Sequence, residues 1–302
     1  MHRSAGPAGA RDRPDDAAMG GAGDAAGDGS GAAPWLRPYA GRLAALLALE
    51  PARRLARLND WALTAGARSG SGRALRFVAA PQAGGPQAGR ARAAERLAYE
   101  QRVFEHGEVA TRVQPPGDRH DLYNALAWIE FPLAKARLNA LHRCAGSAAA
   151  DGAARGPLRD ALTLFDENGA LWLSCDRMLT DALACFDWHG LFVGRRAQVA
   201  QGVAVRVFGH ALLEKLDAPY KGITAHAWPL PLPPDTAPAA VDRALADSLH
   251  PGRLHPRTFC PLPVLGLPGW CEANRDPAFY NDCSVFRPGR MRAAPATHPH
   301  RD

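Results

Sequence analysis

The chain has 302 residues and a mass of 32.2 kDa, which is enough for one large domain or two small ones. Hydrophobic residues make up 47% and charged residues 22%, as in an average globular protein, so the bulk of the chain is neither disordered nor fibrous. The mean hydropathy is -0.24 and no apolar run approaches the length of a membrane span. A membrane partner is therefore not expected.

The net charge of +6 comes almost entirely from arginine, since the lysines are Lys135, Lys215 and Lys221. The arginines are scattered along the chain and form no dense run. This pattern favours solvated surface charge over a nucleic-acid footprint. Nucleic acid remains an open partner class that charge clustering does not support.

Both ends of the chain differ in composition from its middle. Residues 1–33 are rich in Gly, Ala and Asp, which predicts a disordered tail, and they lack the apolar segment of a secretory signal. Translation could also begin at Met19 or later. Residues 290–302 form a second predicted tail, which leaves 34–289 as one globular domain. We expect a cytoplasmic location and six reduced cysteines without a disulfide partner, because no CxxC pair is present.

The predicted elements alternate irregularly between helices and short strands. Helical periodicity predicts helices within 34–64 and over 91–105, 120–142, 176–186, 208–216 and 239–248. Strands are predicted at 75–78 and 109–113, and 203–207 is either a strand or the beginning of the next helix. Pro132 lies inside the 120–142 segment, which predicts a kink or two helices with proline in the first turn of the second.

The second half of the chain contains an Asn-Gly turn signal. Segments 161–165 and 170–173 flank Asp166-Glu167-Asn168-Gly169, and this arrangement predicts a β-hairpin. Residues 228–234 alternate with proline and are expected to be an extended linker, and 259–287 are expected to wrap over the core irregularly. The absence of a regular strand–helix alternation favours an α+β fold. We expect a mainly helical single domain with a small antiparallel sheet or hairpins and an irregular C-terminal wrap.

Polar residues form a stripe on the otherwise apolar 120–142 segment. At 100° per residue, Asn124, Lys135 and His142 point in nearly one direction, provided that the helix is continuous across Pro132. The residues that lie near this direction are His120, Asp121, Trp128 and Asn139. Polar groups on an apolar helix must find partners or face a cleft, so the stripe indicates either a site or structural hydrogen bonds.

Two further clusters add candidate ligands. His210 and Glu214 are one helical turn apart and could chelate an ion or act as an acid–base pair, although this spacing is also common as a surface contact. His226 follows soon after. Asp160 precedes a predicted strand and would lie at its edge, whereas Asp166 and Glu167 belong most simply to the hairpin turn.

Several long and unusual stretches can be compared with known families. They are HDLYNALAWIEFPLAKARLNALH (120–142), RDALTLFDENGAL (159–171), FGHALLEKL (208–216), GITAHA (222–227), PLPVLGLPGW (261–270) and DPAFYNDCSVFRP (276–288). Together they resemble the bacterial domain-of-unknown-function family 3025, over roughly residues 59–288. The resemblance implies a single proteobacterial domain and places the polar motifs within the family pattern, but it brings no established activity.

The candidate residues support one main expectation, a metal-assisted hydrolase that could act on phosphoesters, with a divalent metal ion as the cofactor. The expected metal ligands are His120, Asp121, His142, His210 and His226. The expected catalytic residues are Asp160, Lys135 and Glu214, and the expected ligand-binding residues are Asn124, Trp128, Asn139 and Arg159. Two alternatives stay open: a non-enzymatic protein that binds a ligand or RNA through the stripe, and polar motifs that are purely structural.

Overall fold

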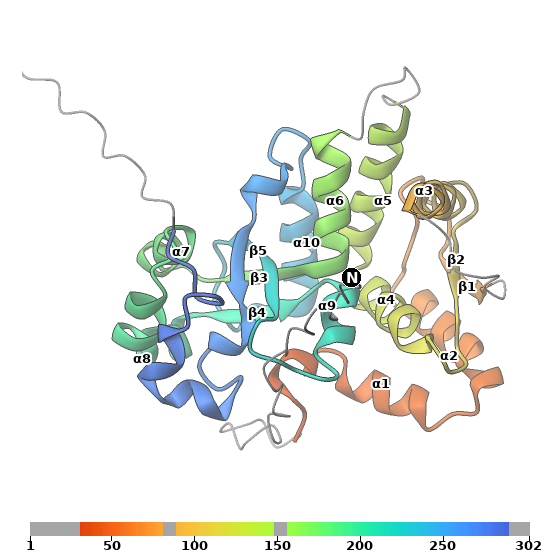
Figure 1. Cartoon of the computed structure of the whole chain (residues 1–302). Coiled ribbons are helices and arrows are strands. Elements are labelled where there is room, and N and C mark those ends of the chain that lie inside the picture. Colours follow the sequence, from red (N-terminus) through yellow and green to blue (C-terminus); the bar gives the residue numbers. More distant parts are fainter. Residues whose placement is uncertain (1–30, 81–88, 148–155, 290–302) are drawn as a thin grey trace, which may run out of the picture.

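The computed structural model describes residues 31–80, 89–147 and 156–289, and it confirms the expected α+β class (Figure 1). Helices account for most of these residues, and the strands form two small sheets. The predicted tails at 1–33 and 290–302 lie outside the described residues, except for 31–33. One continuous cluster of buried side chains extends from Trp35 to Phe286.

The helices are distributed along the whole described part of the chain. The α-helices are α1 (Ala40–Leu47), α2 (Pro51–Thr64), α3 (Gly89–His106), α4 (Asp118–Glu130), α5 (Pro132–Ser147), α6 (Pro157–Asn168), α7 (Arg177–Ala184), α8 (Arg196–Gly202), α9 (His210–Lys215) and α10 (Pro238–Ser248). A π-helical turn, η2 (Gly190–Gly194), precedes α8. The 3₁₀ helices are η1 (Pro34–Leu36), η3 (Pro256–Thr258), η4 (Val264–Gly266), η5 (Glu272–Arg275) and η6 (Pro277–Asn281).

The larger sheet has the strand order β4-β3-β5-β6. Its strands are β3 (Gly169–Leu173), β4 (Ala204–Val207), β5 (Thr224–Leu230) and β6 (Cys260–Pro263). β3 pairs antiparallel with β4 and parallel with β5, and β5 pairs antiparallel with β6, so the sheet is mixed. All five residues of β3 are buried, as its uninterrupted apolar sequence requires of a strand covered on both faces.

The smaller sheet consists of two parallel strands, β1 (Arg76–Ala79) and β2 (Glu108–Thr111). The Asn59 side chain exchanges two hydrogen bonds with the backbone of Phe77 and thereby covers the outer edge of β1. Helices α4 and α9 lie between the two sheets (Figure 1), and they contact each other extensively. This middle layer holds most of the candidate site.

Two predictions for the second half of the chain are wrong. Residues 157–168 form helix α6 instead of the first strand of a hairpin, and Asn168-Gly169 joins this helix to β3. The apolar positions Leu158, Ala161 and Leu162 follow helical spacing, and burial of that face outweighs the local Asn-Gly turn preference. The expected linker at 228–234 begins within β5, a central strand of the sheet.

The 120–142 segment divides at Phe131, whose backbone leaves the helical conformation (φ -126°, ψ 57°). Pro132 then begins α5, where its missing N–H costs nothing. The N–H groups of Leu133 and Ala134 donate to the Asp242 carboxylate on α10, each at 2.9 Å. A buried carboxylate from a distant helix therefore caps α5.

Aromatic rings fill the space between α6 and the larger sheet. The Phe165 ring stacks on Phe208 at 4.9 Å and on Phe259 at 5.5 Å between centroids, and it packs against Trp228 at 6.0 Å. The C-terminal segment wraps over the other end of the sheet, as expected, although it also contributes β6 and short 3₁₀ helices. There, Arg196 donates hydrogen bonds to Asn274 and to the Tyr280 hydroxyl.

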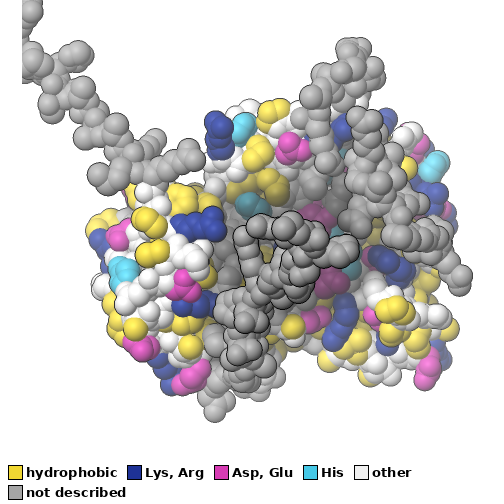
Figure 2. All heavy atoms as spheres, in the orientation of Figure 1, with side chains coloured by type: hydrophobic (Ala, Val, Ile, Leu, Met, Phe, Trp, Pro, Cys, Tyr) yellow, Lys and Arg dark blue, Asp and Glu magenta, His cyan; other side chains and the backbone are white. Residues whose placement is uncertain are grey.

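Surface and thiol features agree with the sequence analysis where the structure describes them. On the face drawn in Figure 2, Lys and Arg side chains are scattered among acidic and apolar ones. No helix within the described ranges is long and apolar enough to cross a bilayer. All six cysteines, each in a described range, are free thiols.

We predict that Asp242→Ala destabilises the protein by about 1–2 kcal/mol, because two backbone N–H groups of α5 lose their acceptor. Chemical denaturation would measure the loss. Asp247→Ala changes an exposed carboxylate on the same helix and should have little effect. Equal stabilities of the two variants would contradict the capping role.

Candidate functional site

A buried ion pair between α5 and α6 forms the base of the site. The Lys135 ammonium donates to Asp166 Oδ1 at 2.5 Å and to Asn124 Oδ1 at 2.9 Å, and its side chain is 4% exposed. It also lies 5.3 Å from the centre of the Trp128 ring, within cation–π range. Burial alone would raise the pKa of Asp166, but Lys135 and His210 together hold it well below its usual range. Asp166 is therefore an anion at neutral pH.

His210 lies at the first position of α9, next to this ion pair. Its Nδ1 is 3.8 Å from Asp166 Oδ2, and its Nε2 is 3.6 Å from Glu167 Oε2. Burial, with a contribution from the Lys135 charge, lowers the pKa of His210 to about 4. The ring is consequently neutral at pH 7 and has a nitrogen lone pair available for a proton or a metal ion.

Gly209 brings His210 close to Glu167. The N–H of Gly209 donates to the Gly169 carbonyl at 2.8 Å. A Cβ atom at Gly169 would collide with the Phe165 carbonyl oxygen of the preceding helix α6, whereas a Cβ atom at Gly209 would collide with the carbonyl oxygen of Glu167 across the junction. Only glycine permits this approach of two backbones. The α6–β3 junction and the start of α9 are held together as a result.

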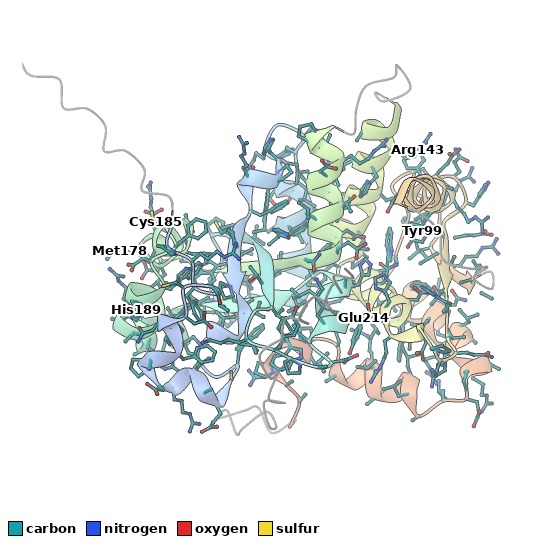
Figure 3. All side chains as sticks on the ribbon, in the orientation of Figure 1. Tyr99, Arg143, Met178, Cys185, His189 and Glu214 are labelled. Atoms are coloured by element: carbon teal, nitrogen blue, oxygen red, sulfur yellow. The ribbon has the colours of Figure 1, made fainter. Side chains whose placement is uncertain are left out.

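His120 on α4 completes the group from the other side. Its Nδ1 is 2.8 Å from Glu214 Oε2, and its ring meets the His210 ring edge to face at 4.5 Å. The side chains of His120 and Glu214 are 32% and 43% exposed, so this half of the site opens to solvent. Figure 3 shows Glu214 on α9, near α4.

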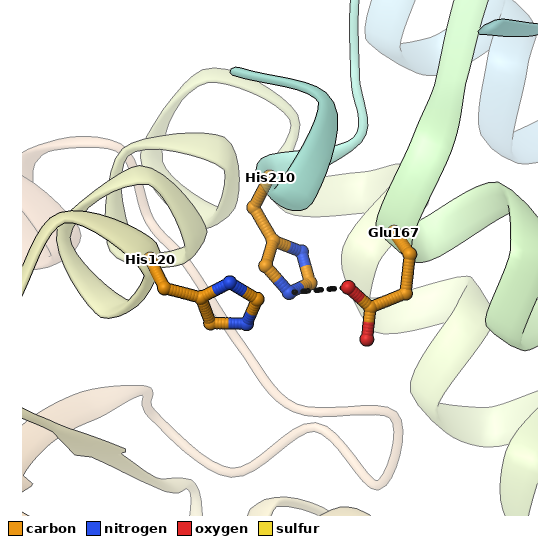
Figure 4. Close-up of side chains that lie close together, drawn as sticks. All are labelled: His120, Glu167 and His210. Carbon is orange, nitrogen blue, oxygen red and sulfur yellow. Dashed lines mark ion pairs between the residues drawn. The ribbon is translucent and has the colours of Figure 1, made fainter. Parts of the chain in front are cut away.

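His120, Glu167 and His210 each offer one ligand atom, and these atoms lie within 4.8 Å of one another. The three side chains come from α4, α6 and α9 and converge on one point (Figure 4). Two imidazoles and one carboxylate are ligands that transition-metal ions prefer. The arrangement could hold one such ion or act as an acid–base cluster.

Asn124 and Trp128, predicted as ligand-binding residues, surround Lys135. Asn124 accepts from Lys135 and donates through Nδ2 to the Tyr99 hydroxyl at 2.9 Å. Burial raises the pKa of Tyr99 well above its usual range, so the hydroxyl stays protonated. A polar chain thus extends from Tyr99 on α3 through Asn124 and Lys135 to Asp166.

Asn139 and His142 lie further along α5. Asn139 donates to the Glu100 carbonyl and carboxylate and accepts from the Gly70 N–H, so it ties α3 and a loop to α5. His142 is buried, and its Nε2 has no hydrogen-bond partner among the described residues. It lies near enough to Asp166 to help lower the pKa of that carboxyl group.

The other predicted site residues lie outside the group of three. Asp121 accepts hydrogen bonds from the backbone and side chain of Arg112. Arg159 and Asp160 occupy the first turn of α6, the end of that helix opposite Asp166. His226 lies on β5, where it pairs in register with Gly169 of β3. Burial lowers the pKa of the His226 imidazole.

Sequence reasoning missed Asp166, Glu167 and Tyr99 as site residues. Asp166 and Glu167 were assigned to a hairpin turn, although Leu158, Ala161, Leu162 and Phe165 already carry a helical period that continues up to them. Recognition of that period would have placed the two acids on the last turn of a helix. No comparable signal indicated Tyr99.

Comparison with known proteins adds a family assignment. The family model described as a protein of unknown function (DUF3025) matches residues 87–290, about two thirds of the chain. The chain belongs to this family. No curated protein and no solved structure matches it. The matched range of this DUF3025 protein contains His120, Glu167 and His210, and the family description names no activity for them.

We predict an acid-dependent loss of stability in the metal-free DUF3025 protein that depends on His210. Between pH 6.5 and about 4, the unfolded chain binds a proton at this ring that the native state does not, so stability falls as the pH drops through this window. Urea denaturation at several pH values should show a smaller loss in His210→Gln. His189→Gln, at an exposed position near α7 (Figure 3), should keep the wild-type slope. Identical slopes in His210→Gln and the wild type would refute the assignment.

We also predict that Lys135→Met destabilises the protein by about 3–5 kcal/mol, because it leaves the Asp166 carboxylate buried without its cation. The double variant Lys135→Met/Asp166→Asn should recover part of this loss, and a double-mutant cycle measures the coupling. Lys215→Met removes an exposed lysine and serves as the control. Additive effects in the cycle would show that the pair contributes no coupling.

Proposed function

We propose that the chain binds one divalent transition-metal ion, best fitted by Zn²⁺, through His120, Glu167 and His210, and that it uses this ion for metal-assisted hydrolysis. The observation that carries the proposal is the convergence of these three ligand atoms within 4.8 Å. Two histidines and one glutamate are a ligand set of catalytic zinc sites, which keep a fourth position for water.

The spacing of the ligand atoms supports this proposal. Ligands about 2.0–2.1 Å from a tetrahedral ion lie roughly 3.3 Å from each other. The 3.6 Å between His210 Nε2 and Glu167 Oε2 is close to that value. All three ligand atoms lie within 4.8 Å of one another, so binding would require side-chain rotations that bring them closer together.

A carboxylate near Nδ1 of each imidazole also supports the proposed metal site. Glu214 contacts Nδ1 of His120 at 2.8 Å, whereas Asp166 Oδ2 lies 3.8 Å from Nδ1 of His210, which has no hydrogen-bond partner among the described residues. Histidine ligands of metals commonly have a carboxylate at the other ring nitrogen, which fixes the tautomer and the ring orientation. Glu214 and Asp166 would be such orienting groups here.

The chemistry follows from the open fourth position. A zinc ion lowers the pKa of its bound water to about 7 and polarises an acyl or phosphoryl oxygen. The site opens to solvent on the side of His120 and Glu214, which are partly exposed. His210, Asp166 and Lys135 form its buried side. Hydrolysis is the reaction class that this combination supports best.

The alternative function, binding of RNA or a ligand through the stripe of Asn124, Trp128, Lys135 and Asn139, has little support. Trp128, Lys135 and Asn139 are each at most 4% exposed, and the polar groups of Lys135 and Asn139 are engaged inside the protein. The remaining alternative is a purely structural role for these polar residues. A measurement of metal binding distinguishes this alternative from the proposed function.

We predict that the full chain, stripped with a chelator, binds one Zn²⁺ per molecule in titration calorimetry, and that Glu167→Gln and His210→Gln each weaken binding by at least roughly 100-fold. His189→Gln, remote from the site, should bind like the wild type. Circular dichroism verifies that each variant is folded. Failure of the wild type to bind, or unchanged affinity in folded Glu167→Gln and His210→Gln, would overturn the proposal.

A further inference from the structure

We propose, on the basis of the function above, that Asn124 and Tyr99 are positioning residues for the metal ligand His210. They act on this ligand through Lys135 and Asp166. The observation behind the inference is a series of polar contacts that runs from α3 to Nδ1 of His210, a buried atom without a hydrogen-bond partner among the described residues.

The Nδ1 atom of His210 needs a partner once the ring binds an ion. A metal ion at Nε2 leaves the proton of the neutral ring on Nδ1. A buried N–H group without an acceptor is costly. Asp166 Oδ2 lies 3.8 Å from this atom, whereas a hydrogen bond requires about 2.9 Å. We therefore expect this contact to shorten to hydrogen-bond length when the ion binds.

Lys135 decides whether Asp166 Oδ2 is available for that bond. The ammonium donates to Asp166 Oδ1 at 2.5 Å and to Asn124 Oδ1 at 2.9 Å, and the Lys135 side chain is 4% exposed. A lysine ammonium has several N–H donors, and burial makes each unpaired donor costly. Because Asn124 accepts from one of them, Lys135 can contact a single oxygen of Asp166 and leave the other oxygen for His210.

Removal of the Asn124 carbonyl would change this arrangement. The ammonium would turn its freed donor to the nearest remaining acceptor, and Asp166 Oδ2 belongs to the carboxylate that it already contacts. Lys135 and the Nδ1–H group of His210 would then compete for the same oxygen. The imidazole would lose the group that orients it, and the affinity of the site for the ion would fall.

Tyr99 fixes the orientation of the Asn124 amide. Asn124 donates through Nδ2 to the Tyr99 hydroxyl at 2.9 Å. An amide has one accepting end and one donating end, so a partner for the donating end keeps the accepting end directed at Lys135. Tyr99 on α3 thus contributes to the geometry of a ligand on α9 without contacting the ion.

Asn139 offers a matched control within the same part of the fold. It is also an asparagine that hydrogen-bonds to α3, but its partners are Glu100 and the backbone of Gly70. Its loss removes buried hydrogen bonds and should lower stability. It should leave the contacts of Lys135 and Asp166 unchanged.

The test measures metal binding by the full chain and by its Asn124→Leu, Tyr99→Phe and Asn139→Leu variants. Each is stripped with a chelator and titrated with Zn²⁺ by calorimetry and with Co²⁺ by visible absorption, whose bands report the ligand geometry at the ion. We expect Asn124→Leu to weaken Zn²⁺ binding roughly tenfold and to shift the Co²⁺ bands. Tyr99→Phe should weaken binding by a smaller factor, about threefold. Asn139→Leu should bind like the wild type, even where it unfolds more easily.

NMR of the Zn²⁺-loaded chain with isotope-labelled histidine tests the hydrogen bond itself. The Nδ1–H proton of His210 should be protected from exchange with solvent in the wild type and in Asn139→Leu. Asn124→Leu should lose this protection. A merely structural role of Asn124 would change neither this signal nor the Co²⁺ bands.

Unchanged Zn²⁺ affinity and Co²⁺ bands in a folded Asn124→Leu variant would overturn the inference. An equal loss of affinity in Asn139→Leu would do the same, because it would indicate a general loosening of the helices. Should Asn124→Leu fail to fold, as judged by circular dichroism, wild-type affinity in Tyr99→Phe would overturn the inference in its place. A wild-type chain that binds neither Zn²⁺ nor Co²⁺ would instead overturn the proposed function.

Discussion

The ion pair between Lys135 and Asp166 is the interaction on which the other features of the site depend. It joins α5 to α6 in a region where both side chains are less than one tenth exposed. Such a pair is stable only when its remaining hydrogen-bonding groups are also satisfied. Asn124 and Tyr99 contribute on one side, and His210 lies on the other. The second oxygen of Asp166 is thereby directed at the imidazole that would bind a metal ion.

Backbone packing supplies the rest of the geometry. Gly209 lets the start of α9 touch the end of α6, which places Glu167 beside His210. α4 packs along α9 and brings His120 to the same point. The site is thus built where three helices meet, and the larger sheet supports two of them. Rigid elements hold ligand geometry more accurately than loops do, which suits a metal centre.

The sequence alone predicted the class of fold and several of the site's residues, but not how they are combined. Helical periodicity placed the 120–142 segment and its polar stripe well, because a long amphipathic pattern depends little on distant contacts. It could not show that Asp242 on α10 caps the second half of that segment. Residues 166–169 were assigned to a hairpin because the Asn-Gly signal is local, whereas the burial of Phe165 against Phe208 and Phe259 depends on distant parts of the chain.

The candidate site, too, could be predicted from the sequence only in part. His120, His210 and Glu214 were recognised as chemically capable residues, and Asp121 and Asn139 had equal standing in the sequence. Only the fold shows that Asp121 is engaged by Arg112 and Asn139 by Glu100. Residue type and spacing identify groups that can do chemistry, whereas partner choice is decided by tertiary contacts that no single helix encodes.

The wide sequence separation of His120, Glu167 and His210 has a consequence for assembly. An unfolded chain would present these ligands far apart, and the entropy of closing such long loops disfavours their meeting around an ion. The three-ligand site exists only after α4, α6 and α9 have docked, so an ion held there would select the native state and add its binding free energy to folding. Metal supply would then set how much of the protein survives thermal or proteolytic challenge, in addition to how much of it is active.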